Sequence, residues 1–124
     1  MTTPAQTART ALDRSVHLGL DPSLELEVYV QAARTTSIKV FAGQVESLVT
    51  AEPRGLGVRA VDGGRVGYAY TGDMTEAGID RVLMEAAENV AAADPDPWAA
   101  LPEAPGEYPL VEGLWSPEVA RLPV

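Results

Sequence analysis

The feature that most constrains the fold is a long region, residues 24–70, in which apolar and polar residues alternate. In its first part, every second residue from Leu24 to Val30 is Leu or Val, and charged, aromatic or amide side chains lie between them. A period of two is typical of a strand with one buried and one solvated face. We therefore expect a strand over residues 24–30.

The alternation recurs in four further segments, and glycine-containing turns separate them. Residues 35–48 alternate on both sides of Ala42-Gly43-Gln44, as in a hairpin. Residues 56–60 lead into Asp62-Gly63-Gly64-Arg65, a strong turn signal because glycine adopts the positive φ that tight hairpins require. Residues 66–70 then alternate again. The pattern predicts about five strands, mostly antiparallel and joined by short turns.

Two segments have the period of an α-helix instead. Residues 5–20 place Leu12, Val16 and Leu20 on one face, and Asp21-Pro22 supplies a stop. This spacing predicts a short amphipathic helix whose three aliphatic residues are buried.

The second helical segment has the stronger pattern, with apolar residues at Ile79, Val82, Leu83, Ala86, Ala87 and Val90. Asp73 is well placed as its N-cap, and Glu76 three residues later completes a pattern like a capping box. Asp94-Pro95 marks its end. The predicted fold class is therefore α+β: a mostly antiparallel sheet with both helices on one face, formed by a domain of residues 1–93.

Residues 94–124 differ in composition from this domain. They contain seven of the ten prolines, so neither a helix nor a central strand is expected to persist, and we interpret them as an extended, Pro-rich acidic tail that links to a missing C-terminal region. Residues 82–124 contain eight acids and one base. Apolar residues that a free linker would not need indicate that the tail docks on its own domain or on more polypeptide: Trp98, Leu101, Tyr108, Leu110, Leu114, Trp115 and Val119.

Charge and composition exclude several classes of function. Nine Lys and Arg against eighteen Asp and Glu give a net charge of −9, which opposes binding to nucleic acid. No apolar stretch approaches the roughly 20 residues that span a bilayer, and the N-terminus has no signal pattern, so we expect a cytoplasmic protein without membrane contact. There is no cysteine and a single histidine, His17, which excludes disulfides, thiolate nucleophiles and sites that need two imidazoles.

The remaining candidates for chemistry have simple structural interpretations. Gly55-Leu56-Gly57 lacks the third glycine of a dinucleotide fingerprint, and we assign these glycines to strand packing. His17, late in the first helix, suits a capping or surface role. Asp94-Pro95-Asp96 lacks the pattern of a calcium loop. Glu25 and Glu27 share one strand face, which we expect to be its solvated face. From the residues alone, no catalytic, cofactor-binding or metal-binding residue is predicted.

A set of short segments, in a fixed order, resembles the N-terminal domain of the TldD/PmbA (TldE) family. The segments are Glu27-Val28-Tyr29-Val30-Gln31, Thr36-Ser37-Ile38-Lys39-Val40, Gly43-Gln44-Val45-Glu46-Ser47, Arg54-Gly55-Leu56-Gly57-Val58-Arg59, Gly64-Arg65-Val66-Gly67-Tyr68-Ala69-Tyr70-Thr71 and Asp73. The resemblance continues through the second helix into Asp94-Pro95-Asp96-Pro97-Trp98 and Leu114-Trp115-Ser116-Pro117.

The resemblance implies a part in proteolysis. Members of the family, historically called modulators of DNA gyrase, are soluble bacterial and archaeal proteins that are longer than this chain. One subunit type has a C-terminal His-Glu-x-x-x-His zinc motif and pairs with a homologous metal-free subunit, and together they cleave unfolded peptides, as in antitoxin turnover and peptide-antibiotic maturation. This sequence cannot contain that motif, because it has one histidine. Zinc is expected only in the catalytic subunit, so no cofactor is expected in this chain.

Three hypotheses about function follow. The leading one is a non-catalytic N-terminal module of a TldD/PmbA-type metallopeptidase assembly, whose partner is a homologous subunit in a homo- or heterodimer, and which scaffolds, pairs subunits or encloses a peptide channel. Its sheet edges, residues 24–30 or 66–70, are expected to pair with a partner or an unfolded peptide. The second is a stand-alone acidic protein that regulates a full-length relative by competing for its dimer surface. The third is an independent hydrolase that uses pairs of acids.

Overall fold

The computed structural model describes residues 3–103 and 106–122 of the chain. Its elements run in the order α1 (Pro4–His17), β1 (Glu25–Ala32), β2 (Thr35–Phe41), β3 (Gln44–Ala51), β4 (Arg54–Asp62), β5 (Arg65–Thr71), α2 (Glu76–Ala92) and α3 (Pro117–Ala120). The α+β class is confirmed, with five strands that all pair antiparallel and two main helices. None of the described helices combines the length and the apolar character needed to cross a membrane.

The five strands lie in two sheets, whereas a single sheet was expected. One has the order β1-β4-β5, and the other contains only β2 and β3. Both belong to one long ribbon, because Ala32 opposes Arg54 and Thr35 opposes Ala51, which keeps the same register across the break. At the break, the Ala33 N–H donates to the Pro53 carbonyl at 3.1 Å, and Pro53 has no N–H to return the bond. The proline thus interrupts the ladder.

Helix α1 begins and ends earlier than the predicted 5–20. Thr3 caps it in a capping box with Gln6, Pro4 occupies the first turn, and Gly19 follows its end with φ +67°. The predicted buried face is wrong for two of its three residues, because Leu12 and Val16 are 41% and 78% exposed while Leu20 is partly buried.

The buried side of α1 is formed instead by Ala11 and Ser15. These small side chains let the helix backbone lie close to the sheet, which larger aliphatic side chains would prevent. The Ser15 hydroxyl donates to the Leu12 carbonyl at 2.7 Å, so its burial leaves no polar atom unpaired.

Strand β4 turns into β5 through Gly63 and Gly64, whose φ angles of +54° and +78° confirm the predicted tight turn. Farther along β5, Gly67 lies against α2: a Cβ there would be 2.0 Å from the Ala86 carbonyl oxygen. The absence of a side chain at this position therefore sets how closely α2 packs on the sheet.

Helix α2 is confirmed, but its predicted N-cap is wrong. Thr75 is the N-cap, and its hydroxyl accepts a hydrogen bond from the Gly78 N–H at 3.2 Å. Asp73 lies two residues before this cap, and its carboxylate accepts from the N–H and hydroxyl of Thr75 at 3.0 and 2.7 Å. Both Asp73 and Thr75 are residue types that cap helices. The prediction chose Asp73 because Glu76 follows it by three residues, and it did not consider Thr75.

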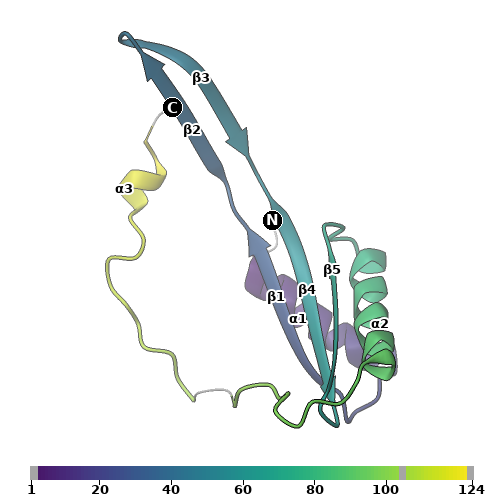
Figure 1. Cartoon of the computed structure of the whole chain (residues 1–124). Coiled ribbons are helices and arrows are strands. Elements are labelled where there is room, and N and C mark those ends of the chain that lie inside the picture. The colour runs from purple at the N-terminus through teal and green to yellow at the C-terminus, as the bar shows by residue number, and fades with distance from the viewer. Residues whose placement is uncertain (1–2, 104–105, 123–124) are drawn as a thin grey trace.

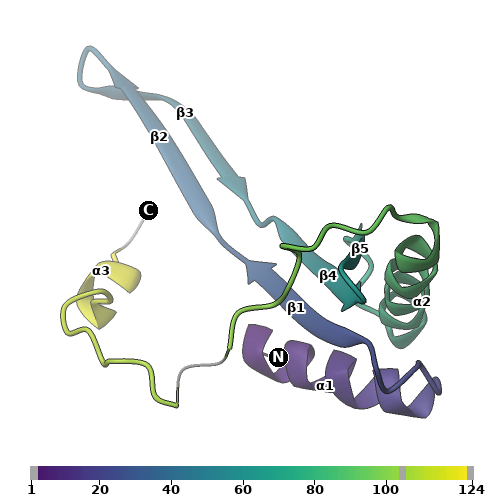
Figure 2. The ribbon, with the colours of Figure 1, turned by 60° about the horizontal axis from the view of Figure 1, so that its bottom comes forward.

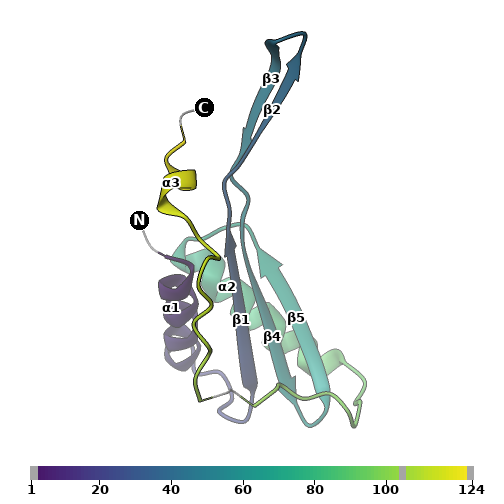
Figure 3. The same cartoon turned by 90° about the vertical axis from the view of Figure 1, so that its left-hand side faces the viewer.

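The core lies between the three-stranded sheet and both helices, which cover the same face (Figures 2 and 3). Helix α1 packs under β1, and α2 packs under β4 and β5. Arg14 joins the helices by donating to Asp80 and, at 3.1 Å, to Glu76. The buried apolar side chains that form this core cluster are Ala11, Leu56, Val58, Ala60, Ala69, Ile79, Val82, Leu83, Ala86 and Val90.

The tail crosses the end of the sheet and runs away from the core (Figure 1). The Asp96 N–H donates to the Gly64 carbonyl at 2.8 Å, which ties its first residues to the β4–β5 turn. The expectation of no helix is wrong at α3, where Pro117 occupies the first turn after the cap Ser116. Most of the tail's predicted apolar anchors do not pack on the domain, because Trp98, Leu110 and Leu114 are at least 80% exposed, whereas Leu101 is partly buried.

Candidate interaction surfaces

Strands β2 and β3 form an arm that projects beyond the core (Figures 1 and 3). Apart from Thr36, every residue of the two strands is exposed. Because opposed residues share a face, the pairs Ile38 with Leu48 and Val40 with Val45 form one aliphatic patch, which we call the arm patch. The arm patch is about half exposed or more at each of these four side chains.

The arm patch continues the apolar side of the ribbon. In β1 the even-numbered residues, such as Val28 and Val30, face the helices, and the unchanged register carries this side into the even-numbered residues of β2. Helices α1 and α2 cover this side only along β1, β4 and β5. The arm patch is therefore built like a core surface but has no covering element among the described residues.

The other side and the tip of the arm are more polar. Lys39 and Glu46 form an ion pair at 2.6 Å beside a shift of register, and Phe41 is 74% exposed near the tip. An exposed ion pair of this kind contributes little to stability. The arm thus has one aliphatic side and one polar side, which suits docking by one face.

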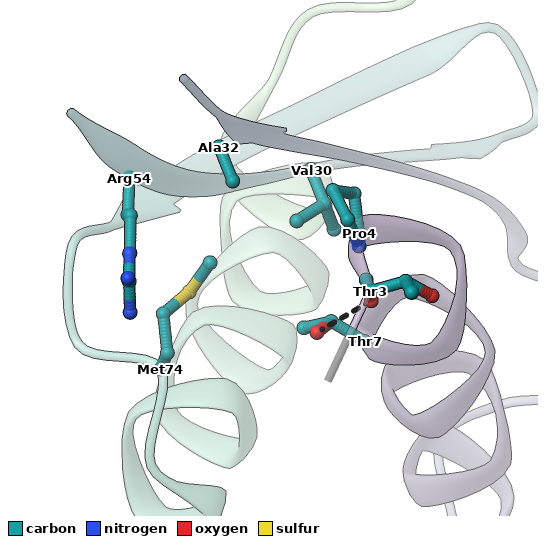
Figure 4. A pocket seen from close by; sticks show the side chains of 7 residues that line it. All are labelled: Thr3, Pro4, Thr7, Val30, Ala32, Arg54 and Met74. Carbon is teal, nitrogen blue, oxygen red and sulfur yellow. Dashed lines mark hydrogen bonds between the residues drawn. The ribbon is translucent and has the colours of Figure 1, made fainter. Parts of the chain in front are cut away.

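A cavity of about 250 Å³ lies where the ribbon leaves the helices (Figure 4). Its lining is mostly apolar, with Arg54 as its charged residue: Thr3, Pro4, Thr7, Val30, Ala32, Arg54 and Met74. The Thr7 hydroxyl donates to the Thr3 carbonyl at 3.2 Å, and Arg54 lies 4.0 Å from Glu52, which also pairs with Arg34 at 3.5 Å. These groups are engaged locally, and the cavity is smaller than typical ligand pockets of roughly 300–1,000 Å³.

The face of the sheet opposite the helices carries an aromatic cluster. Tyr29, Tyr68 and Tyr70 are each more than half exposed, and the rings of Tyr68 and Tyr70 stack with centroids 6.3 Å apart. Gly57 lies beneath them, since a Cβ there would be 2.8 Å from the Tyr68 hydroxyl oxygen. The sequence predicts a packing role for this glycine, and the side chain that packs on it is Tyr68.

The two sheet edges predicted to pair with partners are the edges of the three-stranded sheet, β1 and β5. They differ in access. Helix α2 lies along β5, and the Asn89 side-chain amide donates to the Tyr68 carbonyl at 2.9 Å. The edge of β1 carries no such bond among the described hydrogen bonds.

The residues weighed for chemistry lie on different elements and are exposed. His17 is exposed in the last turn of α1. Glu25 and Glu27 are exposed, and Glu27 pairs with Arg59 at 2.6 Å across the strands. Asp94 and Asp96 are exposed after α2. Within residues 3–103 and 106–122, no three His, Cys, Asp or Glu side chains gather in a way that could hold a metal ion.

The perturbed carboxylates have structural partners. The Arg14 guanidinium, bonded to Asp80, lowers the pKa of that carboxyl. Hydrogen bonds from the Thr75 hydroxyl and N–H lower the pKa of Asp73, and those from the Ser23 N–H and hydroxyl lower the pKa of Asp21. A lowered pKa keeps a carboxylate ionised at neutral pH, which suits a cap or an ion pair rather than a general acid.

The family model described as PmbA/TldA metallopeptidase domain 1 matches residues 26–93, more than half of the chain. The chain belongs to the PmbA/TldA metallopeptidase family. The matched residues extend from β1 through α2 and include the arm. The search of curated proteins found no match.

A solved structure supports the fold of this PmbA/TldA domain. The crystal structure of TldE from Thermococcus kodakarensis matches it with a TM-score of 0.63 and 22% sequence identity over 82% of this chain. The chain covers 23% of TldE, so it corresponds to about a quarter of that protein's length. The likeness shows a shared fold for this part, and the resemblance to the TldD/PmbA (TldE) N-terminal domain is confirmed.

Proposed function

We propose that this domain is a non-catalytic N-terminal module of a TldD/PmbA-type metallopeptidase assembly, where it pairs subunits, scaffolds the assembly or encloses the peptide channel. Membership of the family supports a place in such an assembly. The single histidine supports the lack of catalysis, because the family's zinc motif needs two. Zinc and the hydrolytic residues would then belong to a homologous subunit.

The arm patch is the observation that carries this proposal. A two-stranded hairpin is marginally stable in water unless a third element covers one of its faces. This arm keeps a clustered aliphatic face, Ile38, Val40, Val45 and Leu48, about half exposed or more at each side chain. A contiguous exposed apolar patch of this kind marks a protein interaction site. Covering the patch with a homologous subunit would bury these side chains and fix the angle of the arm.

Binding to full-length family subunits tests the proposal. A TldD-type and a TldE-type subunit would be immobilised in turn, and binding of this chain measured for two matched variants, Leu48→Lys on the arm patch and Met84→Lys on α2. Both positions are about half exposed, so both variants should fold. We expect Leu48→Lys to weaken binding by about tenfold or more, a loss of roughly 1.4 kcal/mol, and Met84→Lys to leave it unchanged. Equal affinities, or no binding at micromolar concentrations, would contradict the proposal.

The non-catalytic part is tested separately. The purified chain, incubated with zinc and an unstructured peptide, should leave the peptide intact over hours. A parallel reaction with an unrelated protein from the same purification controls for contaminating protease. Cleavage that follows this chain through a second purification would overturn this part of the proposal.

The tail favours a second candidate, a stand-alone acidic protein that regulates a full-length relative by competing for its dimer surface. Trp98, Leu110, Leu114 and Trp115 are at least 72% exposed, so they are available to a partner. An excess of this chain should then reduce the dimer fraction of a full-length pair, which sedimentation measures. An unchanged dimer fraction would contradict this second candidate and leave the N-terminal module as the remaining function.

A further inference from the structure

The ribbon loses its supports one after another on the way from the core to the arm. The last pair that β5 forms with β4 is Thr71 opposite Leu56. Helices α1 and α2 pack on β1, β4 and β5, whereas β2 and β3 pack on each other. Beyond Leu56 the ribbon is therefore two strands wide, and the arm extends past both helices (Figures 1 and 3).

The four residues between the two sheets form a weakened part of the ladder. Ala33 opposes Pro53 as a hydrogen-bonded pair, which exchanges two bonds in an intact ladder. Among the described hydrogen bonds, this pair has only the bond from the Ala33 N–H to the Pro53 carbonyl, because proline has no N–H. By the same alternation, Arg34 and Glu52 are a non-hydrogen-bonded pair. One backbone bond therefore spans residues 33–34 and 52–53.

The side chains at the break add little stiffness. Ala32 and Ala33 are too small to pack across the ribbon. Glu52 lies 3.5 Å from Arg34 and 4.0 Å from Arg54, and all three side chains are more than half exposed. Exposed ion pairs at such distances contribute little to stability. The angle of the arm is thus weakly fixed by the described side chains.

Space for movement lies beside the break. The cavity of about 250 Å³ lies under Val30 and Ala32, on the helix-covered side of the ribbon, and Pro4 and Met74 also line it (Figure 4). A second hollow, of about 340 Å³, lies at the break itself. Methionine adapts to changes in packing because its side chain is unbranched and flexible. A swing of the arm toward the helices can therefore begin by closing the first cavity.

We propose that residues 33–34 and 52–53 form a hinge, about which β2 and β3 swing as one rigid hairpin. Hinges are a few residues at the ends of elements that absorb a change in backbone angles, and these four residues lie between strand ends. The arm patch and the cavity lie on the same side of the ribbon, so the swing moves the arm patch toward Pro4 and Met74. The hinge sets the angle at which the arm patch meets a covering element.

This proposal goes beyond the family role proposed above and does not depend on it. The movement is a property of the isolated chain, so it can be present in a chain that binds no homologous subunit. A rigid arm, in turn, can still bind one through the arm patch. Failure of either proposal leaves the other standing.

Residual dipolar couplings of the backbone amides, measured by NMR in a weakly aligned sample, test the hinge. In a rigid molecule, one alignment fits the arm and the three-stranded sheet equally well. With the hinge, the arm couplings should fit a single hairpin but be smaller than those of the three-stranded sheet by about a third or more. Equal alignment of the two parts would overturn the proposal. Arm couplings that fit no single hairpin would also overturn it, because the arm would then not move as a rigid body.

A disulfide across the break tests where the movement occurs. The chain has no cysteine, so Arg34→Cys combined with Glu52→Cys creates one possible intramolecular disulfide. The Cα atoms of a non-hydrogen-bonded pair lie about 4.5 Å apart, a separation that a disulfide spans. Oxidation should raise the arm couplings to the level of the three-stranded sheet, and reduction should lower them again.

A second disulfide provides the matched control. Thr36→Cys combined with Thr50→Cys joins opposed residues of the same ribbon, but inside the arm. Its oxidation should leave the arm couplings reduced, because this bond does not cross the hinge. The proposal would be wrong if the disulfide at positions 34 and 52 left the arm couplings unchanged, or if the control raised them equally.

Discussion

The inner and outer halves of one ribbon have similar alternating sequences and opposite environments. In the inner half, β1 and β4, the apolar side packs on α1 and α2, and Val58 and Leu56 are fully buried. In the outer half, β2 and β3, the same side carries the arm patch and is exposed. The comparison teaches that alternation specifies a strand with an apolar face, while the presence of a covering element decides whether that face is core or interface.

The difference has an energetic consequence. Full burial of a Val or Leu side chain stabilises a fold by roughly 1.5–3 kcal/mol. Inner residues such as Val58 contribute this to the isolated domain, whereas Val40 or Leu48 contribute little until something covers them. Burial of the arm patch would therefore contribute to the free energy of binding a partner, but it contributes little to the stability of the isolated domain.

The largest predicted effect tests this division directly. Leu83→Ala, beneath the inner half, removes a fully buried side chain and should lower the free energy of unfolding by about 2–5 kcal/mol. Leu48→Ala, on the arm patch, should change it by less than about 0.5 kcal/mol. Urea unfolding of both variants measures the contrast. Equal losses would show that the arm is already packed in the isolated chain.

Gly67→Ala should have the next largest effect, because the packing of α2 on β5 leaves no room for a Cβ. The added carbon would lie 2.0 Å from the Ala86 carbonyl oxygen and 2.6 Å from the Val90 nitrogen, so backbone must move. We expect a loss of about 1–3 kcal/mol in unfolding free energy. Gly55→Ala is the matched control, since its nearest atom is 3.8 Å away, and a comparable loss there would contradict the explanation.

The ion pair that joins the helices under the inner half predicts a pH dependence. The pKa of Asp80 is lowered in the folded chain by its bond to Arg14. The folded state then binds fewer protons than the unfolded state, so the stabilisation is present above the unfolded pKa of about 3.9 and is lost as pH falls through the folded pKa. Asp80→Asn should unfold with a flatter pH dependence in this acid range. An unchanged slope would show that the pair does not stabilise the helices.

The smallest effect concerns the break between the halves. Pro53→Val supplies an N–H opposite the Ala33 carbonyl and should complete the ladder there. The amide at position 53 should exchange slowly, while the unfolding free energy should change by no more than about 0.5 kcal/mol. Rapid exchange of that amide would mean that another feature causes the break.

Much of the fold is predictable from local patterns. The strands over 24–30, 35–48, 56–60 and 66–70, the glycine turn at Gly63-Gly64 and the second helix all follow from period and turn chemistry. The family was also predictable, because several short segments resemble the TldD/PmbA N-terminal domain in the same order. The boundaries of α1 were also available, because Thr3-Pro4 and Gln6 form a capping box with proline in the first turn.

The rest depends on what lies across space. Leu12 and Val16 form a helical stripe whether or not a neighbour covers it, and small residues such as Ala11 give no strong signal of burial. The exposure of the outer half depends on where the helices stop, which the alternation of Ile38 and Val40 does not encode, and the division into two sheets depends on a single interrupted pair. Pro53 was the available signal, because a proline within a strand pattern indicates a break in pairing. The arm patch is not predictable from the sequence for the same reason, whereas the sheet edges at residues 24–30 and 66–70 are among the sequence predictions.

Amide hydrogen exchange of the arm, with and without a homologous full-length subunit, tests the central claim most directly. In the isolated chain, amides of β2 and β3 should exchange faster than those of β4. On binding, the amides around Ile38 and Leu48 should slow by at least about tenfold, while those of the inner half stay unchanged. Slowing confined to the inner half, with the arm still exchanging rapidly in the complex, would contradict the account.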